Sequence, residues 1–315
     1  MKKYISHIVL FLFATNLTYS QIGGYAGAFS RMGFGSRGIG MGNSMTAVSN
    51  GEISSYYNPA LIPFAEKRTA SISLGFMPFD RYINFLSYSQ SIKPSAGLSI
   101  GIINAGVKNI DSRDNDGYHL KYLSTSENQF YLAFGNRIHP NVSLGITVKI
   151  FYYSLYDKVS STTVGFDLGA LITATKNISI AIALQDLGSN YKWNTAAIYG
   201  QSGGQTTNKF PNLRRLAVAY KLPKRLGTIA AEFENSSVKS NFIRLGGEIV
   251  LHEYFTIRSG VDRWDVKSNT SGIKPTFGFS VNKPFDDWTP IITYAYVLEP
   301  FSIGGIHLVS LSIIF

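Results

Sequence analysis

Apolar and polar side chains alternate along most of the chain, and the C-terminal segment shows the pattern most clearly. In the last seven residues, Val309, Leu311 and Ile313 fall on one face of an extended strand, whereas Ser310 and Ser312 fall on the other. A strand with one apolar and one polar face suits a β-barrel whose outer wall contacts lipid and whose inner wall does not.

The same period of two residues predicts fourteen strands. They span residues 68–76, 82–92, 95–104, 127–138, 142–155, 160–175, 178–187, 213–222, 226–235, 239–251, 254–262, 272–282, 289–298 and 302–315. Tight turns follow the even-numbered strands, and the two long connections, residues 105–126 and 188–212, follow odd-numbered ones. This asymmetry is typical of outer-membrane barrels, in which the turns are periplasmic and the loops extracellular. The sequence therefore predicts an all-β fold, a fourteen-stranded antiparallel transmembrane β-barrel without free edges.

The alternation also assigns a face to the charged residues within the strands. When the apolar positions face lipid, seven charged side chains face the lumen: Lys149, Asp167, Glu232, Glu234, Arg244, Glu248 and Arg258. A charge facing lipid near the midplane would cost about 2 to 4 kcal/mol, which explains this segregation. The alternative fold, a secreted β-sandwich, would bury its apolar faces and expose its charges.

Strand pairing around the turns brings some of these charges together. If strands five and six pair about residues 156–158, two of the inward charges lie directly opposite each other. The expected ion pairs are Lys149 with Asp167, Glu234 with Arg244, and Glu248 with Arg258, forming a ladder on the lumen wall. The alternative is that these charges are solvated separately in a water-filled pore.

Both ends of the chain carry signals of export. Lys2 and Lys3, the apolar run 8–14 and the small residues around position 20 indicate a cleaved signal peptide. The apolar run is far shorter than the roughly 20 residues of a membrane-spanning helix. The terminal Phe315 is the expected signal for the outer-membrane assembly machinery. We therefore expect a signal peptide at 1–20, an N-terminal plug or hatch segment at 21–67 and the barrel at 68–315.

Composition narrows the function classes. Charged residues make up 15% of the chain, against about 25% in a typical soluble domain. The net charge of +10 falls to +8 without the two signal-peptide lysines, and the basic residues are scattered. We therefore expect outer-membrane lipid, and no nucleic acid, as the partner of these cations. The chain has no cysteine, and its five histidines share no metal-ligand spacing and no catalytic arrangement. The run 111–117 resembles a calcium loop but lacks the required acidic residue at position twelve. We expect no enzyme activity, cofactor or metal site.

The region ahead of the first strand is rich in glycine and carries two motifs. Gly40-Met41-Gly42 follows Arg37, and Tyr57-Asn58-Pro59-Ala60 lies shortly before strand one. The glycines permit tight bends and close approach to a wall, and Asn-Pro favours a turn. Because hydrocarbon cannot satisfy an irregular backbone, this segment is expected inside the barrel, with Asn58-Pro59 near the periplasmic mouth.

These motifs resemble the N-terminal region of the FadL-like (OMPP1/FadL/TodX) barrels, and more closely the PorV/PorQ family within them. Gln185-Asp186-Leu187-Gly188 resembles a later element of the family, usually Gln-Asn-Leu-Gly. The resemblance implies a fourteen-stranded barrel with an internal plug. It also implies a non-enzymatic role in type IX protein secretion or cell-surface assembly, with a secretion translocon or cargo proteins as partners.

The resemblance leaves open a second function, a FadL-like channel for uptake of hydrophobic small molecules, whose partner would be a hydrophobic ligand. Fatty-acid transporters of that branch are longer and have more elaborate loops. The expected mature length of 295 residues (315 less 20) and the presence of only two long connections therefore favour the secretion role.

Overall fold

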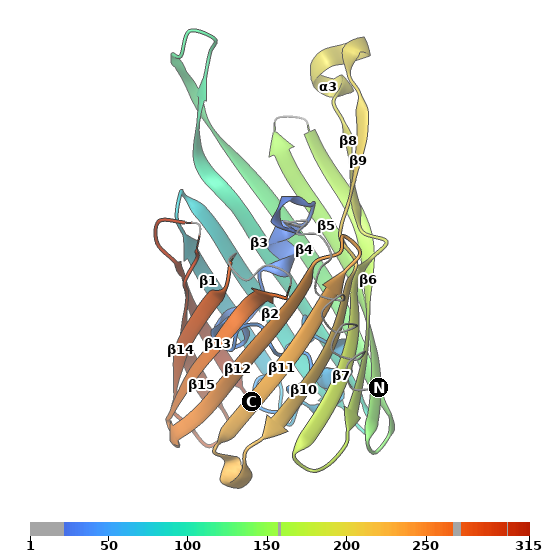
Figure 1. Cartoon of the computed structure of the whole chain (residues 1–315), viewed down its shortest axis with the longest axis vertical. Helices are drawn as coiled ribbons and strands as arrows, with labels where there is room; N and C mark the ends of the chain where they lie inside the picture. The colour runs from blue at the N-terminus through green and yellow to red at the C-terminus, as the bar shows by residue number, and fades with distance from the viewer. Residues whose placement is uncertain (1–21, 157–158, 267–271, 301) are drawn as a thin grey trace, which may run out of the picture.

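The computed structural model describes residues 22–156, 159–266, 272–300 and 302–315, so the expected signal peptide lies outside the described residues. Its main feature is a closed antiparallel barrel, which confirms the predicted all-β fold with fourteen strands in the wall (Figure 1). The wall consists of β1 (Thr69–Met77), β2 (Arg81–Ile92), β3 (Ala96–Arg113), β4 (His119–His139), β5 (Val142–Tyr156), β6 (Val159–Thr173), β7 (Ile178–Leu187), β10 (Leu213–Lys221), β11 (Gly227–Ser236), β12 (Asn241–His252), β13 (Phe255–Asp265), β14 (Lys274–Asn282), β15 (Thr289–Val297) and β16 (Ile306–Ile314). β1 pairs with β16, which closes the wall.

Two hairpins extend beyond the barrel at one end (Figure 1), and both correct the expected loops. β3 and β4 remain paired across two irregularities, so most of residues 105–126 is paired strand. Within residues 188–212, β8 (Asn190–Asn194) pairs with β9 (Gln205–Lys209), and helix α3 (Ala196–Tyr199) lies between them. The outer part of the β3–β4 hairpin and all of β9 are largely exposed, so they lack the alternation from which strands are predicted. β8 does alternate, with Tyr191 and Trp193 buried, but it is only five residues long. We call this end of the barrel the long-loop end and the other the short-turn end.

The two faces of the wall differ as expected. In β5, Leu144, Ile146 and Val148 are exposed, whereas Thr147 and Lys149 are buried. The other long strands repeat this alternation around the barrel. A closed belt of exposed apolar side chains is the lipid-facing surface of a transmembrane barrel. Among the described residues, no helix has the length and hydropathy needed to cross a membrane.

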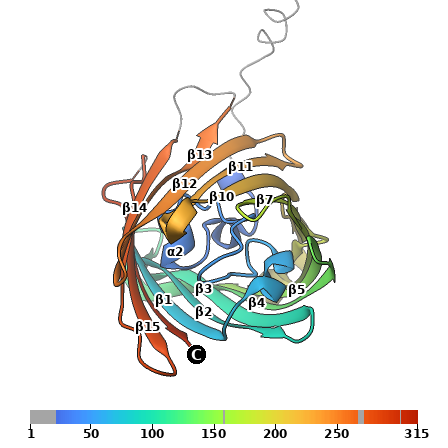
Figure 2. The same cartoon turned by 90° about the horizontal axis from the view of Figure 1, so that it is seen from below.

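Residues 22–65 lie inside the barrel and are called the inner segment below (Figure 2). They form three short 3-10 helices, η1 (Ile22–Gly24), η2 (Ala28–Arg31) and η3 (Pro59–Phe64), and one short α-helix, α2 (Gly35–Gly40). Most of their side chains are buried. They donate to and accept from inward-facing groups of the wall, so the inner segment and the wall form one packed core.

Candidate functional site

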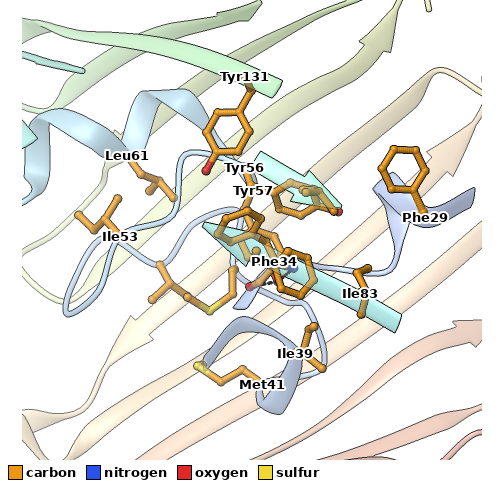
Figure 3. Close-up of a cluster of buried hydrophobic side chains, with 14 of the residues drawn as sticks. Phe29, Phe34, Ile39, Met41, Ile53, Tyr56, Tyr57, Leu61, Ile83 and Tyr131 are labelled. Carbon is orange, nitrogen blue, oxygen red and sulfur yellow. Dashed lines mark hydrogen bonds between the residues drawn. The ribbon is translucent and has the colours of Figure 1, made fainter. Parts of the chain in front are cut away.

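The centre of the lumen is an aromatic cluster shared by the inner segment and the wall (Figure 3). Phe34 stacks on Tyr56 with ring centroids 5.4 Å apart, and it also contacts the rings of Phe85 and Tyr131 from the wall. The Tyr57 hydroxyl accepts a hydrogen bond from the backbone N–H of Phe34 at 2.9 Å. These contacts tie the inner segment to β2 and β4.

The Tyr57-Asn58-Pro59 motif lies at the short-turn end against a row of wall glycines. The Asn58 side chain caps η3 by accepting from the N–H of Ala60 at 2.9 Å. The glycine row crosses four neighbouring strands in register and consists of Gly97, Gly135, Gly145 and Gly169. A Cβ at any of them would overlap η3 or Asn58, so the motif docks where the wall has no side chains.

The Gly40-Met41-Gly42 motif docks on a second glycine patch. Gly246 of β12 and Gly260 of β13 face each other across the pair of strands. A Cβ at Gly246 would overlap the carbonyl oxygen of Met41, and one at Gly260 would overlap the backbone of Met41 and Gly42. Two glycine-rich patches of the wall therefore match the two motifs of the inner segment.

Replacing Gly246 with Ala should loosen the inner segment, because the added methyl group would overlap the backbone carbonyl of Met41. A backbone group cannot rotate out of the way as a side chain can. We expect faster protease cleavage within residues 22–65 and a lower unfolding midpoint, both measured on the purified barrel. The neighbouring Gly247→Ala is the control, since its Cβ would lie 3.7 Å from the nearest atom, the Thr228 carbonyl oxygen. Equal cleavage rates in the two variants would contradict the docking role of Gly246.

Arg37 anchors the inner segment to the wall through a buried ion pair. Its Nη2 lies 2.5 Å from Oε1 of Glu248, and its Nε lies 3.1 Å from Oε2. Its Nη1 donates to the carbonyl oxygens of Asn50 and Glu52. Nε of Arg258 shares the Glu248 carboxylate at 3.1 Å. The expected Glu248–Arg258 pair is thus present. Arg37, which also binds this carboxylate, lies outside the strands, so strand register could not predict it.

Arg244 is the centre of a second charged group, on β10 to β13. Its Nη1 lies 3.0 Å from Glu232 and 2.9 Å from Glu234, and its Nε lies 2.7 Å from Asp262. Nε of Arg215 lies 2.8 Å from Glu234. The expected Arg244–Glu234 pair is present. Sequence reasoning missed Arg215 and Asp262, although alternation along β10 already placed Arg215 inward.

Lys149 forms the third group with two aspartates. Its Nζ lies 2.7 Å from Asp167 and 2.8 Å from Asp186, and all three side chains are buried. The expected register is wrong by two residues, because Asp167 pairs with Thr147 and Lys149 pairs with Gly165. The ion pair forms nevertheless, since a lysine side chain can reach a diagonal neighbour. The seven predicted lumen charges therefore belong to three separate groups.

The Gln185-Asp186-Leu187-Gly188 element joins this third group to the inner segment. It forms an irregularity in β7, where Asp186 has a φ of +61°. The Asp186 N–H donates to Asp167 at 2.9 Å. The Gln185 side chain donates to the Tyr56 carbonyl oxygen at 2.7 Å. The aspartate that departs from the family pattern is therefore a partner of Lys149.

Replacing Lys149 with Met should destabilise the barrel by about 3 kcal/mol, because Asp167 and Asp186 would stay buried without their cation. The urea midpoint, followed by intrinsic fluorescence in micelles, measures the loss. The triple variant K149M/D167N/D186N should recover most of it, since it removes the charges together. If the triple variant were as unstable as K149M, lost packing and not lost charge balance would be the cause.

Phe315 lies at the short-turn end, where the barrel closes. Its backbone pairs with that of Arg68 through two hydrogen bonds of 3.0 Å, and its side chain is exposed on the outer face. Its role as an assembly signal stays a prediction.

The acidic turn of the β3–β4 hairpin is paired within itself. Asp111 accepts from Nε of Arg113 at 2.8 Å and lies 2.5 Å from Nδ1 of His119. The bond to His119 and then the bond to Arg113 lower the pKa of Asp111. Within the described ranges, no group of three or more His, Cys, Asp or Glu side chains is placed to hold a metal ion.

A cavity of about 190 Å³ lies at the long-loop end, between the inner segment and the wall from β13 through β16 to β2. We call it the outer cavity. Its apolar lining consists of Ala28, Met32, Ile39, Ile83, Val297, Ile306 and Leu308. Its charged lining consists of Arg31, Arg81, Arg263, Lys274, Asp262 and Glu299. Four cations and two carboxylates therefore share the lining with apolar side chains, so the cavity is amphipathic.

No family model and no curated protein matches this chain. Solved structures of outer-membrane channels do share its fold. A FadL homologue from Pseudomonas aeruginosa superimposes with a TM-score of 0.61 at 11% identity, over 89% of this chain and 98% of that chain. The toluene transporter TodX from Pseudomonas putida gives a TM-score of 0.60 at 12% identity, over 90% of this chain and 96% of that chain. The chain therefore has the fold of the FadL/TodX-type barrels, whereas membership of the PorV/PorQ family is not shown.

Proposed function

We propose that this protein is an outer-membrane channel that binds and passes small hydrophobic or amphipathic molecules, without enzymatic activity. The outer cavity carries the proposal, because it places a surface of apolar and charged side chains inside the barrel at the end with the long hairpins. The apolar outer wall and the short-turn asymmetry support a location in the outer membrane. The function is the alternative that the sequence left open, and the FadL/TodX-type fold favours it over the secretion role.

The cavity limits the size and chemistry of the ligand. The cavity of about 190 Å³ is close in size to an engineered cavity of about 150 Å³ that binds benzene, so it has room for a single ring or a short chain. Lys274 is paired with Glu299 at 2.6 Å. Arg31 and Arg81 donate to backbone carbonyl oxygens. The excess of cations favours a ligand that carries a polar or anionic group on its apolar body.

Filling the cavity tests this function. Leu308 is buried in the cavity lining, and the adjacent Val309 faces outward on the same strand. Leu308→Trp should reduce binding of 4-fluorobenzoate at least tenfold in fluorine NMR of the purified protein, because the larger ring occupies the space. Val309→Trp should bind as the parent chain does. Equal binding by both variants, or no binding by the parent chain, would refute the proposed site.

One observation favours the secretion role as a second candidate. The β3–β4 hairpin extends well beyond the wall and exposes Tyr118, Leu120 and Tyr122, whose exposed fractions are 73%, 60% and 68%. Exposed aromatic side chains on a projecting element suit contact with a protein partner. Affinity purification from outer membranes, compared with a Y118S/L120S/Y122S variant, tests this. Loss of a translocon or cargo protein only in the variant would support it.

A further inference from the structure

A second cavity lies on the same side of the lumen, toward the short-turn end. Its volume is about 40 Å³, enough for one or a few water molecules, and we call it the inner cavity. The wall lines it with seven hydroxyl side chains, Thr69, Ser71, Ser87, Ser89, Thr293, Ser310 and Ser312. The start of α2 lines the opposite side. Hydroxyl groups therefore dominate the wall side of the inner cavity, whereas charged and apolar side chains line the outer cavity.

A thin barrier separates the two cavities. On β2, Ile83 lines the outer cavity and Ser87 lines the inner one, and Phe85 lies between them. Phe34 of the inner segment closes on Phe85, with ring centroids 4.9 Å apart. Next to this contact, the Ser310 hydroxyl lies 2.5 Å from the Ser36 hydroxyl. These two contacts join the inner segment to the β16–β1–β2 wall.

Elsewhere the inner segment is held more firmly. On the side of β4 to β6, the rings of Phe29, Phe151 and Phe210 pack against one another. On the side of β12 and β13, backbone lies directly on Gly246 and Gly260, and Arg37 is paired with Glu248. Serine hydroxyl pairs exchange for water with little net loss, whereas a broken buried ion pair leaves an uncompensated charge. The β16–β1–β2 side is therefore the easiest place for the segment to separate from the wall.

We propose that solutes cross the barrel between α2 and the β16–β1–β2 wall, from the outer to the inner cavity, and that Phe34, Phe85 and the Ser36–Ser310 contact form the gate. The inference rests on the proposed function and adds to it the route and the residues that close it. The hydroxyl-lined exit selects solutes with a hydrogen-bonding group. The buried Thr293 hydroxyl has no hydrogen-bond partner in the part of the chain that the structure describes, and a purely apolar molecule would cover it and leave it without water.

A reversible cross-link tests the gate, because the chain contains no cysteine. The S36C/S310C variant would join the inner segment to the wall when oxidised. The control, S71C/S312C, joins two wall strands within the same cavity, where the two hydroxyls lie 2.8 Å apart. In proteoliposomes, oxidised S36C/S310C should take up 4-fluorobenzoate at least tenfold more slowly, and dithiothreitol should restore the rate. The control should not respond. Unchanged uptake through the oxidised gate pair would overturn the route.

A second measurement tests the route separately from the proposed function. If the parent chain takes up no organic solute, the proposed function is refuted, but ion conductance still tests the gate. The F34A/F85A variant should show a rise in ion conductance of at least fivefold in planar bilayers. F29A/F151A removes the same aromatic volume beside β5, three strands away from β2 in the wall, and should leave conductance near that of the parent chain. Mobility on gels with and without boiling verifies that both barrels are folded. Equal conductance of the two variants would overturn the gate.

Discussion

Replacing Arg244 with Met is expected to destabilise the barrel by about 3 to 5 kcal/mol, because three buried carboxylates would lose their shared cation. Arg244 is 1% exposed and contacts Glu232, Glu234 and Asp262 at 2.7 to 3.0 Å. Methionine keeps much of the volume, so the loss reports charge rather than a cavity. The free energy of unfolding in urea, with the barrel in micelles, measures it.

Two variants separate this effect from a general effect of removing an arginine. Arg214→Met is the first variant. Arg214 is exposed on the outer face of β10, where its Nη1 donates a hydrogen bond to Asn235 at 3.5 Å. It should change the free energy of unfolding by less than about 1 kcal/mol. R244M/E234Q/D262N should recover most of the stability lost by R244M. If R214M and R244M were equally unstable, the buried network would not be the cause.

Deleting residues 23–57 is expected to raise single-channel conductance in planar bilayers from near zero to a measurable value. The deletion removes η2, α2 and the Phe34, Tyr56 and Tyr57 rings of the aromatic cluster, which fill the lumen, while all fourteen wall strands remain. Glu248 keeps Arg258 as its partner, so the wall is not left with an unpaired carboxylate there. Conductance should therefore report the open lumen and not an unfolded chain.

A second deletion provides the control for this experiment. Replacing residues 195–204, at the tip of the β8–β9 hairpin, with two glycines removes mostly exposed side chains and leaves the lumen filled. This variant should not conduct more than the parent chain. Steady conduction by the intact protein would contradict the closed lumen and indicate an open channel.

Strand number, strand faces and the inward position of the charges could all be predicted from local pattern. A transmembrane wall must present apolar side chains to lipid at every second position, so Leu144, Ile146 and Val148 reveal β5 without knowledge of its neighbours. For the same reason Lys149 and Asp167 could be assigned to the lumen before their partners were known. The projecting parts of β3, β4 and β9 escaped prediction, because strands that face water on both sides need no alternation. β8, which buries Tyr191 and Trp193, escaped prediction because it is only five residues long.

Only the folded chain defines which charged side chains form ion pairs and which wall residues the inner segment contacts. Arg37 reaches Glu248 across 211 positions of sequence, and a register error of two residues was enough to misplace Lys149 relative to Asp167. The glycine row from Gly97 to Gly169 has no local signature, since its four members come from four different strands. The cavities likewise arise only where the inner segment meets the wall. Periodicity determines the wall because lipid acts on each strand separately, whereas the lumen is determined by packing between segments far apart in the sequence.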